Sequence, residues 1–155
     1  MNTIIKDIHA RALIDCKGKP LLEVDVITED GIMGRGASPS GISAGEHEAL
    51  VLRDGDKNWY DGQGVFKAVD TVKRVVAPML RGMNVLDQKK IDEALISLDG
   101  TKNKSVLGGN VTYSTSLAAM RAACQTLHLS QYRYLNGGEI KTIPLPTSDM
   151  FAGGS

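Results

Sequence analysis

The sequence has no excess of charge of either sign and no long hydrophobic run, and each absence excludes a class of partner. Lysine and arginine together number 18, as do aspartate and glutamate, so no overall positive field would draw the chain to nucleic acid or an anionic membrane. No window approaches the roughly 20 continuous apolar residues that a membrane-spanning helix needs. We therefore expect no nucleic acid and no membrane as partner.

Cysteine is also scarce, and the pattern of the few metal-binding residue types excludes a zinc site. Cys16 and Cys124 lie far apart, and neither has a second cysteine near it that would form a metal knuckle or a redox CxxC pair. The histidines, His9, His47 and His128, lack the spacing of zinc ligands. We expect reduced structural thiols. The N-terminal segment lacks the charged-then-apolar order of a signal peptide, which predicts a cytoplasmic protein.

The length of 155 residues suits about one domain, and the first forty residues predict three strands. Even positions in 8–14 are apolar and alternate with polar ones, as in a strand with one face in water. After a turn at 15–20, leucine and valine alternate with acidic residues in 22–26. A hairpin signal at 29–31 precedes a third short strand at 32–37. The sequence thus predicts a three-stranded antiparallel meander.

The rest of the chain predicts helices. Residues 48–52 suggest a single turn, and valines at helical spacing predict an amphipathic helix over 65–80. A shorter helix is expected at 91–98, ended by Asp99 and Gly100. Asn110 would cap a third helix with one face made of Ser114, Leu117, Arg121, Cys124 and His128. Strands followed by helices predict an α+β fold in which the sheet buries one face on a helical layer.

The stretch 37–49, hereafter the 37–49 loop, lies where the predicted strands give way to helices. It is rich in glycine, proline and serine, and loops of this kind on a rigid support are where ligand contacts collect. His47 is the one histidine within it, and an exposed loop histidine is an equally good interpretation. Ser40 and Ser43 lack a neighbouring base that would activate a nucleophile, so turn-forming serines also explain them.

Two other stretches begin a ligand-binding pattern without completing it. Residues 54–58 alternate oxygen-bearing side chains as a calcium loop does, but Trp59 replaces the glycine and Val65 the glutamate that an EF-hand needs. We interpret this stretch as a solvated turn. Gly108 and Gly109 precede a helix and could receive an anion, yet no dinucleotide or phosphate-loop motif surrounds them, and a helix cap explains them.

The motifs, taken in order, resemble those of the enolase family. The stretch 39–56, PSGISAGEHEALVLRDGD, is similar to the family pattern PSGASTGxxEAxELRDGD. Five further stretches are similar to DSRGNPTVEV, GVxKAVxxVN, LDGTxNKS, LGANAxLxVSLA and LPVPxxNxxNGGS, and they lie at 15–25, 64–70, 98–105, 107–118 and 143–155. The resemblance spans nearly the whole chain.

The resemblance implies a domain organisation and an activity. Residues 1–138 would be the enolase N-terminal capping domain, and 139–155 the start of a truncated α/β barrel domain. Enolase is a phosphopyruvate hydratase, a carbon–oxygen lyase of glycolysis that interconverts 2-phosphoglycerate and phosphoenolpyruvate with Mg²⁺. The barrel carboxylates, the lysine base and the acid glutamate are not in the sequence. We therefore expect catalysis from the full-length parent but none from this chain alone.

The resemblance also implies site residues and partners. Ser43 would ligate the second Mg²⁺, which suits a hard cation that prefers oxygen ligands. Other residues would belong to the loops that contact a small phosphorylated carboxylic acid: Ser40, Gly41, Ile42, His47, Gly154 and Ser155. Glu23 matches the family glutamate that forms an inter-subunit ion pair, which implies a homodimer through the sheet.

Some positions depart from the family pattern and leave two alternatives open. Lys17 replaces an arginine, and lysine cannot reproduce bidentate guanidinium pairing. Ala44 replaces a loop threonine, and Ala152 replaces the asparagine before Gly-Gly-Ser. One alternative is an enolase paralogue that acts on a related phospho- or phosphono-acid. The other is a non-catalytic dimerisation or binding module.

Overall fold

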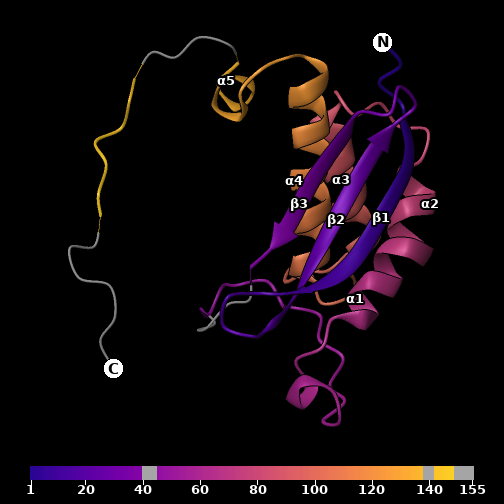
Figure 1. The fold of residues 1–155 in the computed structure, drawn as a ribbon, viewed down its shortest axis with the longest axis vertical. Helices are drawn as coiled ribbons and strands as arrows, with labels where there is room; N and C mark the ends of the chain where they lie inside the picture. Colours follow the sequence, from indigo (N-terminus) through magenta and orange to yellow (C-terminus); the bar gives the residue numbers. More distant parts are fainter. Residues whose placement is uncertain (40–44, 138–141, 149–155) are drawn as a thin grey trace.

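A computed structural model describes residues 1–39, 45–137 and 142–148, and it confirms the predicted meander. The strands β1 (Ile5–Ile14), β2 (Pro20–Thr28) and β3 (Met33–Ser38) are antiparallel in the order β1-β2-β3 (Figure 1). Ala10 pairs with Val24, and Val24 pairs with Gly36, so these three lie on one face of the sheet. All three are buried, which identifies this face as the one turned to the core.

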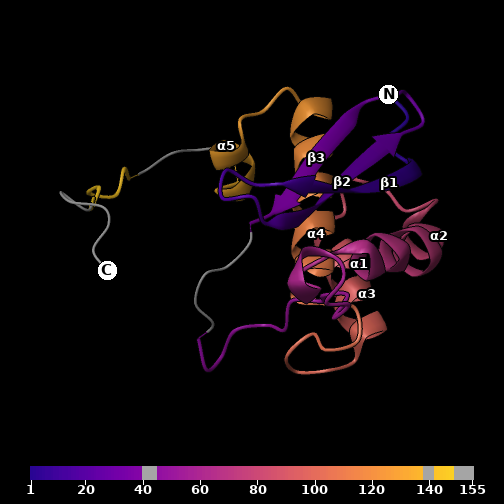
Figure 2. The ribbon, with the colours of Figure 1, turned by 60° about the horizontal axis from the view of Figure 1, so that its bottom comes forward.

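The predicted helices are present: the run at 65–80 and the third helix cover that face, while the helix between them packs on the third (Figure 2). The run expected at 65–80 consists of α1 (Phe66–Thr71), the π-helical η2 (Val72–Val76) and α2 (Ala77–Leu80). The helices α3 (Gln88–Asp99) and α4 (Gly109–Thr126) follow, and Gly100 ends α3 in the left-handed conformation, as expected. Two short elements were not predicted: η1 (Tyr60–Gly62) and α5 (Gln131–Leu135). No helix in the described part of the chain is long and apolar enough to span a membrane.

Two of the expected helix features are wrong, for related reasons. Residues 48–52 form no helix, because their backbone groups bond to distant partners: the Leu50 amide donates to the Asn103 carbonyl (2.8 Å). Asn110 does not cap α4, which begins at Gly109 with Gly108 as the capping residue and no side-chain cap. The Asn110 amide instead bonds to the backbone of Leu52.

The face of α4 that packs on the sheet is only partly the predicted one. Ser114 and Cys124 are buried as expected, but Leu117 and Arg121 are half-buried, and His128 is exposed beyond the helix end. The buried stripe instead includes Val111, Ala118, Ala119, Ala122 and Ala123. Within this stripe, Ala118 and Ala122 lie against Gly34, and Ala118 also lies against Gly36, so small side chains of α4 meet the glycines of β3.

Both cysteines are free thiols, as the sequence predicts. Cys16 is exposed in the turn between β1 and β2, whereas Cys124 is buried on α4. Burial raises the pKa of the Cys124 thiol, because the low-dielectric interior disfavours the thiolate. Cys124 therefore behaves as a small apolar core residue.

Candidate functional site

The motif-bearing segments meet at the end of the sheet where β3 stops. The first two residues of the 37–49 loop, Ala37 and Ser38, still belong to β3. The segments 45–54 and 100–110 lie beside each other at the start of α4. We call these two segments, 45–54 and 100–110, the loop cluster. A hollow of about 340 Å³ lies here, and its lining residues are Ser38, Pro39, Glu48, Ala49, Val51, Gly109, Asn110 and Tyr113.

Backbone and amide hydrogen bonds join the two segments of the loop cluster. The Asn110 side chain accepts from the Leu52 amide (3.0 Å) and donates to the Leu52 carbonyl (3.1 Å). The Gly109 amide donates to the Leu50 carbonyl (2.7 Å), and the Leu50 amide donates to the Asn103 carbonyl (2.8 Å). Directly after the 37–49 loop, the amide and the carbonyl of both Leu50 and Leu52 are therefore hydrogen-bonded to 100–110.

Two glycines make this close approach possible. A Cβ on Gly108 would lie 2.6 Å from the Leu52 Cβ, and the positive φ of 96° at Gly108 also disfavours any other residue. A Cβ on Gly109 would lie 2.8 Å from the Ala49 Cβ. The glycine pair thus serves contact with the 45–54 segment, a role that the helix-cap interpretation did not include.

Asp99 holds the second segment in shape. This residue is 3% exposed, and its carboxylate accepts from the amides of Leu107 (2.7 Å), Val106 (3.2 Å) and Thr101 (3.0 Å), and from the Thr101 hydroxyl. Burial acts to raise the pKa of Asp99, but these hydrogen bonds outweigh it and hold the pKa below its usual value. Asp99 therefore folds 100–107 so that the Asn103 carbonyl reaches Leu50.

The sequence interpretation missed both Asp99 and Asn110 as organisers of the loop cluster. Asp99 was predicted only as a helix end, although an aspartate two residues before a threonine can form a local side-chain turn. That signal exists in Leu98-Asp99-Gly100-Thr101. For Asn110 no local signal exists, because its partner Leu52 lies 58 positions away in the sequence.

Asp54 and Arg53 tie the cluster to α1 and to the first turn of the chain. The Asp54 carboxylate accepts from the amides of Phe66 (3.0 Å) and Lys67 (2.7 Å), so it satisfies the free N–H groups at the start of α1. Arg53 donates to the carbonyls of Pro20 (2.7 Å) and Gln63 (2.8 Å). The predicted solvated turn at 54–58 therefore begins with a residue that stabilises a helix start.

Most of the predicted site residues lie outside the described residues. These are Ser40, Gly41, Ile42, Ser43, Gly154 and Ser155. His47 is described, and it is exposed within a turn closed by a bond from the Glu48 amide to the Gly45 carbonyl (3.1 Å). Across 1–39, 45–137 and 142–148, no group of three or more histidine, cysteine, aspartate or glutamate residues could hold a metal ion.

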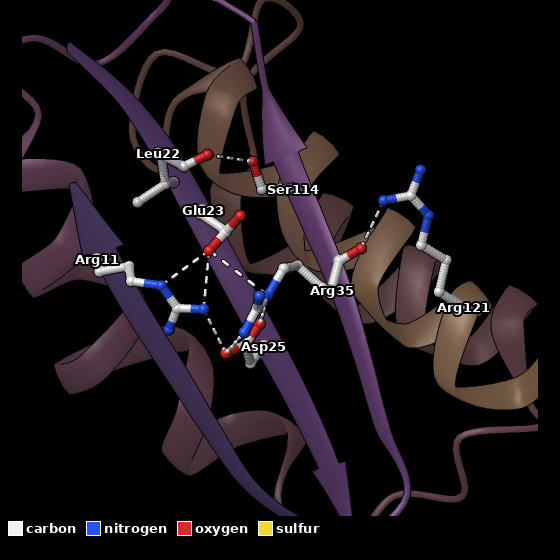
Figure 3. A network of polar contacts seen from close by, with 7 residues as sticks. All are labelled: Arg11, Leu22, Glu23, Asp25, Arg35, Ser114 and Arg121. Atoms are coloured by element: carbon white, nitrogen blue, oxygen red, sulfur yellow. Dashed lines mark hydrogen bonds and ion pairs between the residues drawn. The ribbon is translucent and has the colours of Figure 1, made fainter. Parts of the chain in front are cut away.

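The sheet face opposite the helices carries an ion-pair network that contains Glu23 (Figure 3). Arg11 Nε donates to Glu23 Oε1 (2.8 Å), and Arg11 Nη2 donates to Asp25 Oδ2 (2.6 Å). Arg35 Nε donates to Asp25 Oδ1 (2.7 Å). Burial acts to raise the pKa of Asp25, but hydrogen bonds from Arg35 and Arg11 lower it below its ordinary value. Two arginines and two carboxylates thus form a neutral cluster that spans all three strands.

Comparison with known families adds one finding to this geometry. A family model described as "Enolase, N-terminal domain" matches residues 5–135. The matched range begins at the first residue of β1 and ends at the last residue of α5. It therefore contains every strand and helix of the described chain, and the whole loop cluster.

Proposed function

The chain belongs to the enolase family as its N-terminal domain, and from this premise we propose that the full-length protein interconverts 2-phosphoglycerate and phosphoenolpyruvate. Family membership makes it an enolase-like protein; the particular substrate is our proposal. The observation that carries it is the loop cluster, in which the motif-bearing segments meet beside the end of β3. Such an assembly is suited to hold a ligand-contacting loop in place.

Within this proposal the domain contributes the 37–49 loop and one metal ligand. The loop would close over a small phosphorylated carboxylic acid and exclude water from it. Ser43 is the residue of this chain that we assign to the second Mg²⁺. When bound, Mg²⁺ supplies positive charge that stabilises a developing enediolate oxygen. The reaction would be a step of glycolysis in the cytoplasm.

The proposal is tested by the dehydration of 2-phosphoglycerate, followed through the absorbance of phosphoenolpyruvate. A protein that carries this domain together with the barrel domain that the family resemblance implies is expected to show Mg²⁺-dependent turnover. A second candidate is a paralogue that acts on a related phospho- or phosphono-acid, favoured by Ala44 and Ala152 where the family has threonine and asparagine. Turnover of such an acid, with none of 2-phosphoglycerate, would support the paralogue instead.

Ser43→Ala in the full-length protein tests the metal assignment. Mutation of residues that hold a metal ligand in place lowers metal affinity or activity roughly 10- to 100-fold. Loss of the ligand itself is therefore expected to raise the half-saturating Mg²⁺ concentration at least about 10-fold. The matched control is Ser97→Ala, because Ser97 is exposed on α3. A magnesium titration of activity for the three proteins is the measurement. An unchanged titration for Ser43→Ala would remove Ser43 from this role.

We further propose that the protein is a homodimer through the sheet face that carries Glu23. The proposal is supported by the position of Glu23 in the four-residue network, where its side chain is 12% exposed and its partner Arg11 is 36% exposed. A guanidinium has five N–H donors, so an arginine can bond to a carboxylate of its own chain and to a second chain at the same time. The face is thus chemically suited to an interface rich in ion pairs.

Glu23→Gln is expected to weaken such a dimer. Removing one charge from a hydrogen-bonded interfacial network should raise the dissociation constant at least about 10-fold, and more at low salt. Sedimentation velocity over a range of concentrations is the measurement. The control is Glu93→Gln, since Glu93 lies on α3, its side chain is 61% exposed, and its ion pair with Lys89 is long (3.8 Å). If both variants dimerise as the unmodified protein does, Glu23 is not part of the interface.

A further inference from the structure

We propose that Asn110 is a positioning residue for the reaction, because it fixes the point at which the 37–49 loop rejoins the domain. The inference rests on the proposed function, which places that loop at the substrate. Asn110 does not itself belong to the loop, and its effect would pass through Leu52. Residues 45–54 would then stay in one position while a substrate binds beside them.

The burial and bonding of Asn110 support this role. The residue is 3% exposed, and both functional atoms of its amide bond to the two backbone groups of Leu52 (3.0 and 3.1 Å). An asparagine amide has a C=O that accepts and an NH₂ that donates. It can therefore bond to the N–H and the C=O of one backbone residue, as a neighbouring strand does. Because the helix cap is Gly108, the start of α4 does not require the Asn110 amide.

The surroundings of Asn110 restrict what else could hold Leu52. Gly108 and Gly109 bring the start of α4 against the 45–54 segment, where a Cβ on Gly108 would lie 2.6 Å from the Leu52 Cβ. One turn further along α4, the Ser114 hydroxyl donates to the Leu22 carbonyl (3.4 Å) on β2, beside Ser38, and not to Leu52. Loss of the Asn110 amide would therefore leave both backbone groups of Leu52 without a partner from α4.

The three side chains asparagine, aspartate and alanine separate the possible roles. Asn110→Asp keeps the volume and the acceptor for the Leu52 amide, but it places an oxygen against the Leu52 carbonyl. Asn110→Ala removes both hydrogen bonds. Thr126→Ala is the matched control, since Thr126 is also buried on α4 and its hydroxyl donates to the Ala122 carbonyl (2.9 Å) at the far end of the helix. If Asn110 had a purely structural role, all three variants would show similar changes in exchange and in kinetics.

The test uses the full-length protein in two measurements. Without metal or substrate, amide hydrogen exchange at Leu50 and Leu52 is expected to rise at least about 10-fold in Asn110→Ala, where the Leu52 amide loses its acceptor. The same rise is expected in Asn110→Asp, where repulsion between the carboxylate and the Leu52 carbonyl displaces the segment. Exchange should be unchanged in Thr126→Ala. In the 2-phosphoglycerate assay, the two Asn110 variants should lose about 10-fold in kcat/KM, mostly through KM, because a displaced loop weakens substrate binding before it affects the chemistry. The control should keep both kinetic constants.

Each outcome decides something. Unchanged exchange at Leu50 and Leu52 in Asn110→Asp would overturn the inference, as would equal kinetic losses in Thr126→Ala. If Asn110→Ala does not fold, Asn110→Asp alone decides, because it keeps the side-chain volume and one of the bonds. If the unmodified protein does not act on 2-phosphoglycerate, the proposed function fails. Raised exchange in the variants would then still show that Asn110 positions Leu52.

Discussion

Gly34→Ala is expected to cost at least about 3 kcal/mol in the free energy of unfolding, the upper end of the usual cost of overpacking a core. A Cβ on Gly34 would lie 2.1 Å from the Ala118 carbonyl oxygen and 2.2 Å from the Ala122 amide nitrogen. Both atoms belong to the backbone of α4, so no side-chain rotation can relieve the clash. The sheet and α4 would have to separate, although domains of this size have only about 5–15 kcal/mol of stability.

The measurement is urea unfolding of the protein with the unmodified chain and Gly45→Ala as references. Among the described residues, no atom lies within 4 Å of a Cβ added to Gly45, and its φ is not left-handed, so its replacement is expected to change stability by less than about 0.5 kcal/mol. A large loss of stability in Gly34→Ala but not in Gly45→Ala would show that the contact with α4 is responsible, and not the replacement of a glycine in general. Equal unfolding midpoints for the two variants would contradict the packing described here.

The strands and the longer helices could be predicted because their signals are local. Alternation along 8–14 and 22–26 depends only on neighbours in the sequence, and the valine spacing of 65–80 fits one face of a helix. The buried face of α4 could be predicted only in part, since its contact with Gly34 joins residues more than 80 positions apart. Periodicity alone does not show which small side chains of a helix meet the glycines of a distant strand.

The loop cluster shows the same limit more sharply. A turn of helix at 48–52 is what the local sequence favours, but this segment is not helical and bonds to Asn103 and Asn110 instead. Tertiary contacts of this kind override weak helix propensity. Asn110 was predicted as a cap because asparagine often begins helices, whereas its amide serves a distant segment. The roles of Ser43 and His47 come from the family resemblance and stay predictions.

Asp99→Asn is expected to cost about 3 kcal/mol at neutral pH, because a carboxylate that accepts four hydrogen bonds is replaced by an amide with only one acceptor atom. The buried Leu107 amide, which donates to Asp99 over 2.7 Å, would then face either a second donor or a weakened acceptor. The loop 100–107 would lose its shape, and with it the Asn103 carbonyl that bonds to Leu50.

The effect of Asp99→Asn should also depend on pH in a fixed direction. Hydrogen bonds lower the pKa of Asp99 in the folded protein below the value of about 3.9 expected in the unfolded chain. The carboxylate therefore stabilises the fold fully above the unfolded pKa, and this contribution is lost as the pH falls through the folded pKa. The stability gap between the unmodified protein and Asp99→Asn should be largest near pH 7 and should shrink below about pH 4.

Urea unfolding at pH 7 and at pH 3 measures this gap, with Asp70→Asn as the control. Asp70 is 60% exposed and lies 3.6 Å from Arg74, so its replacement is expected to have little effect at either pH. A gap for Asp99→Asn that is the same at both pH values would show that the carboxylate charge is not what holds the loop. A variant as stable as the unmodified protein at pH 7 would remove Asp99 as an organiser of the loop cluster. The expected result instead links one buried charge to the segment that bonds to Leu50, directly after the 37–49 loop.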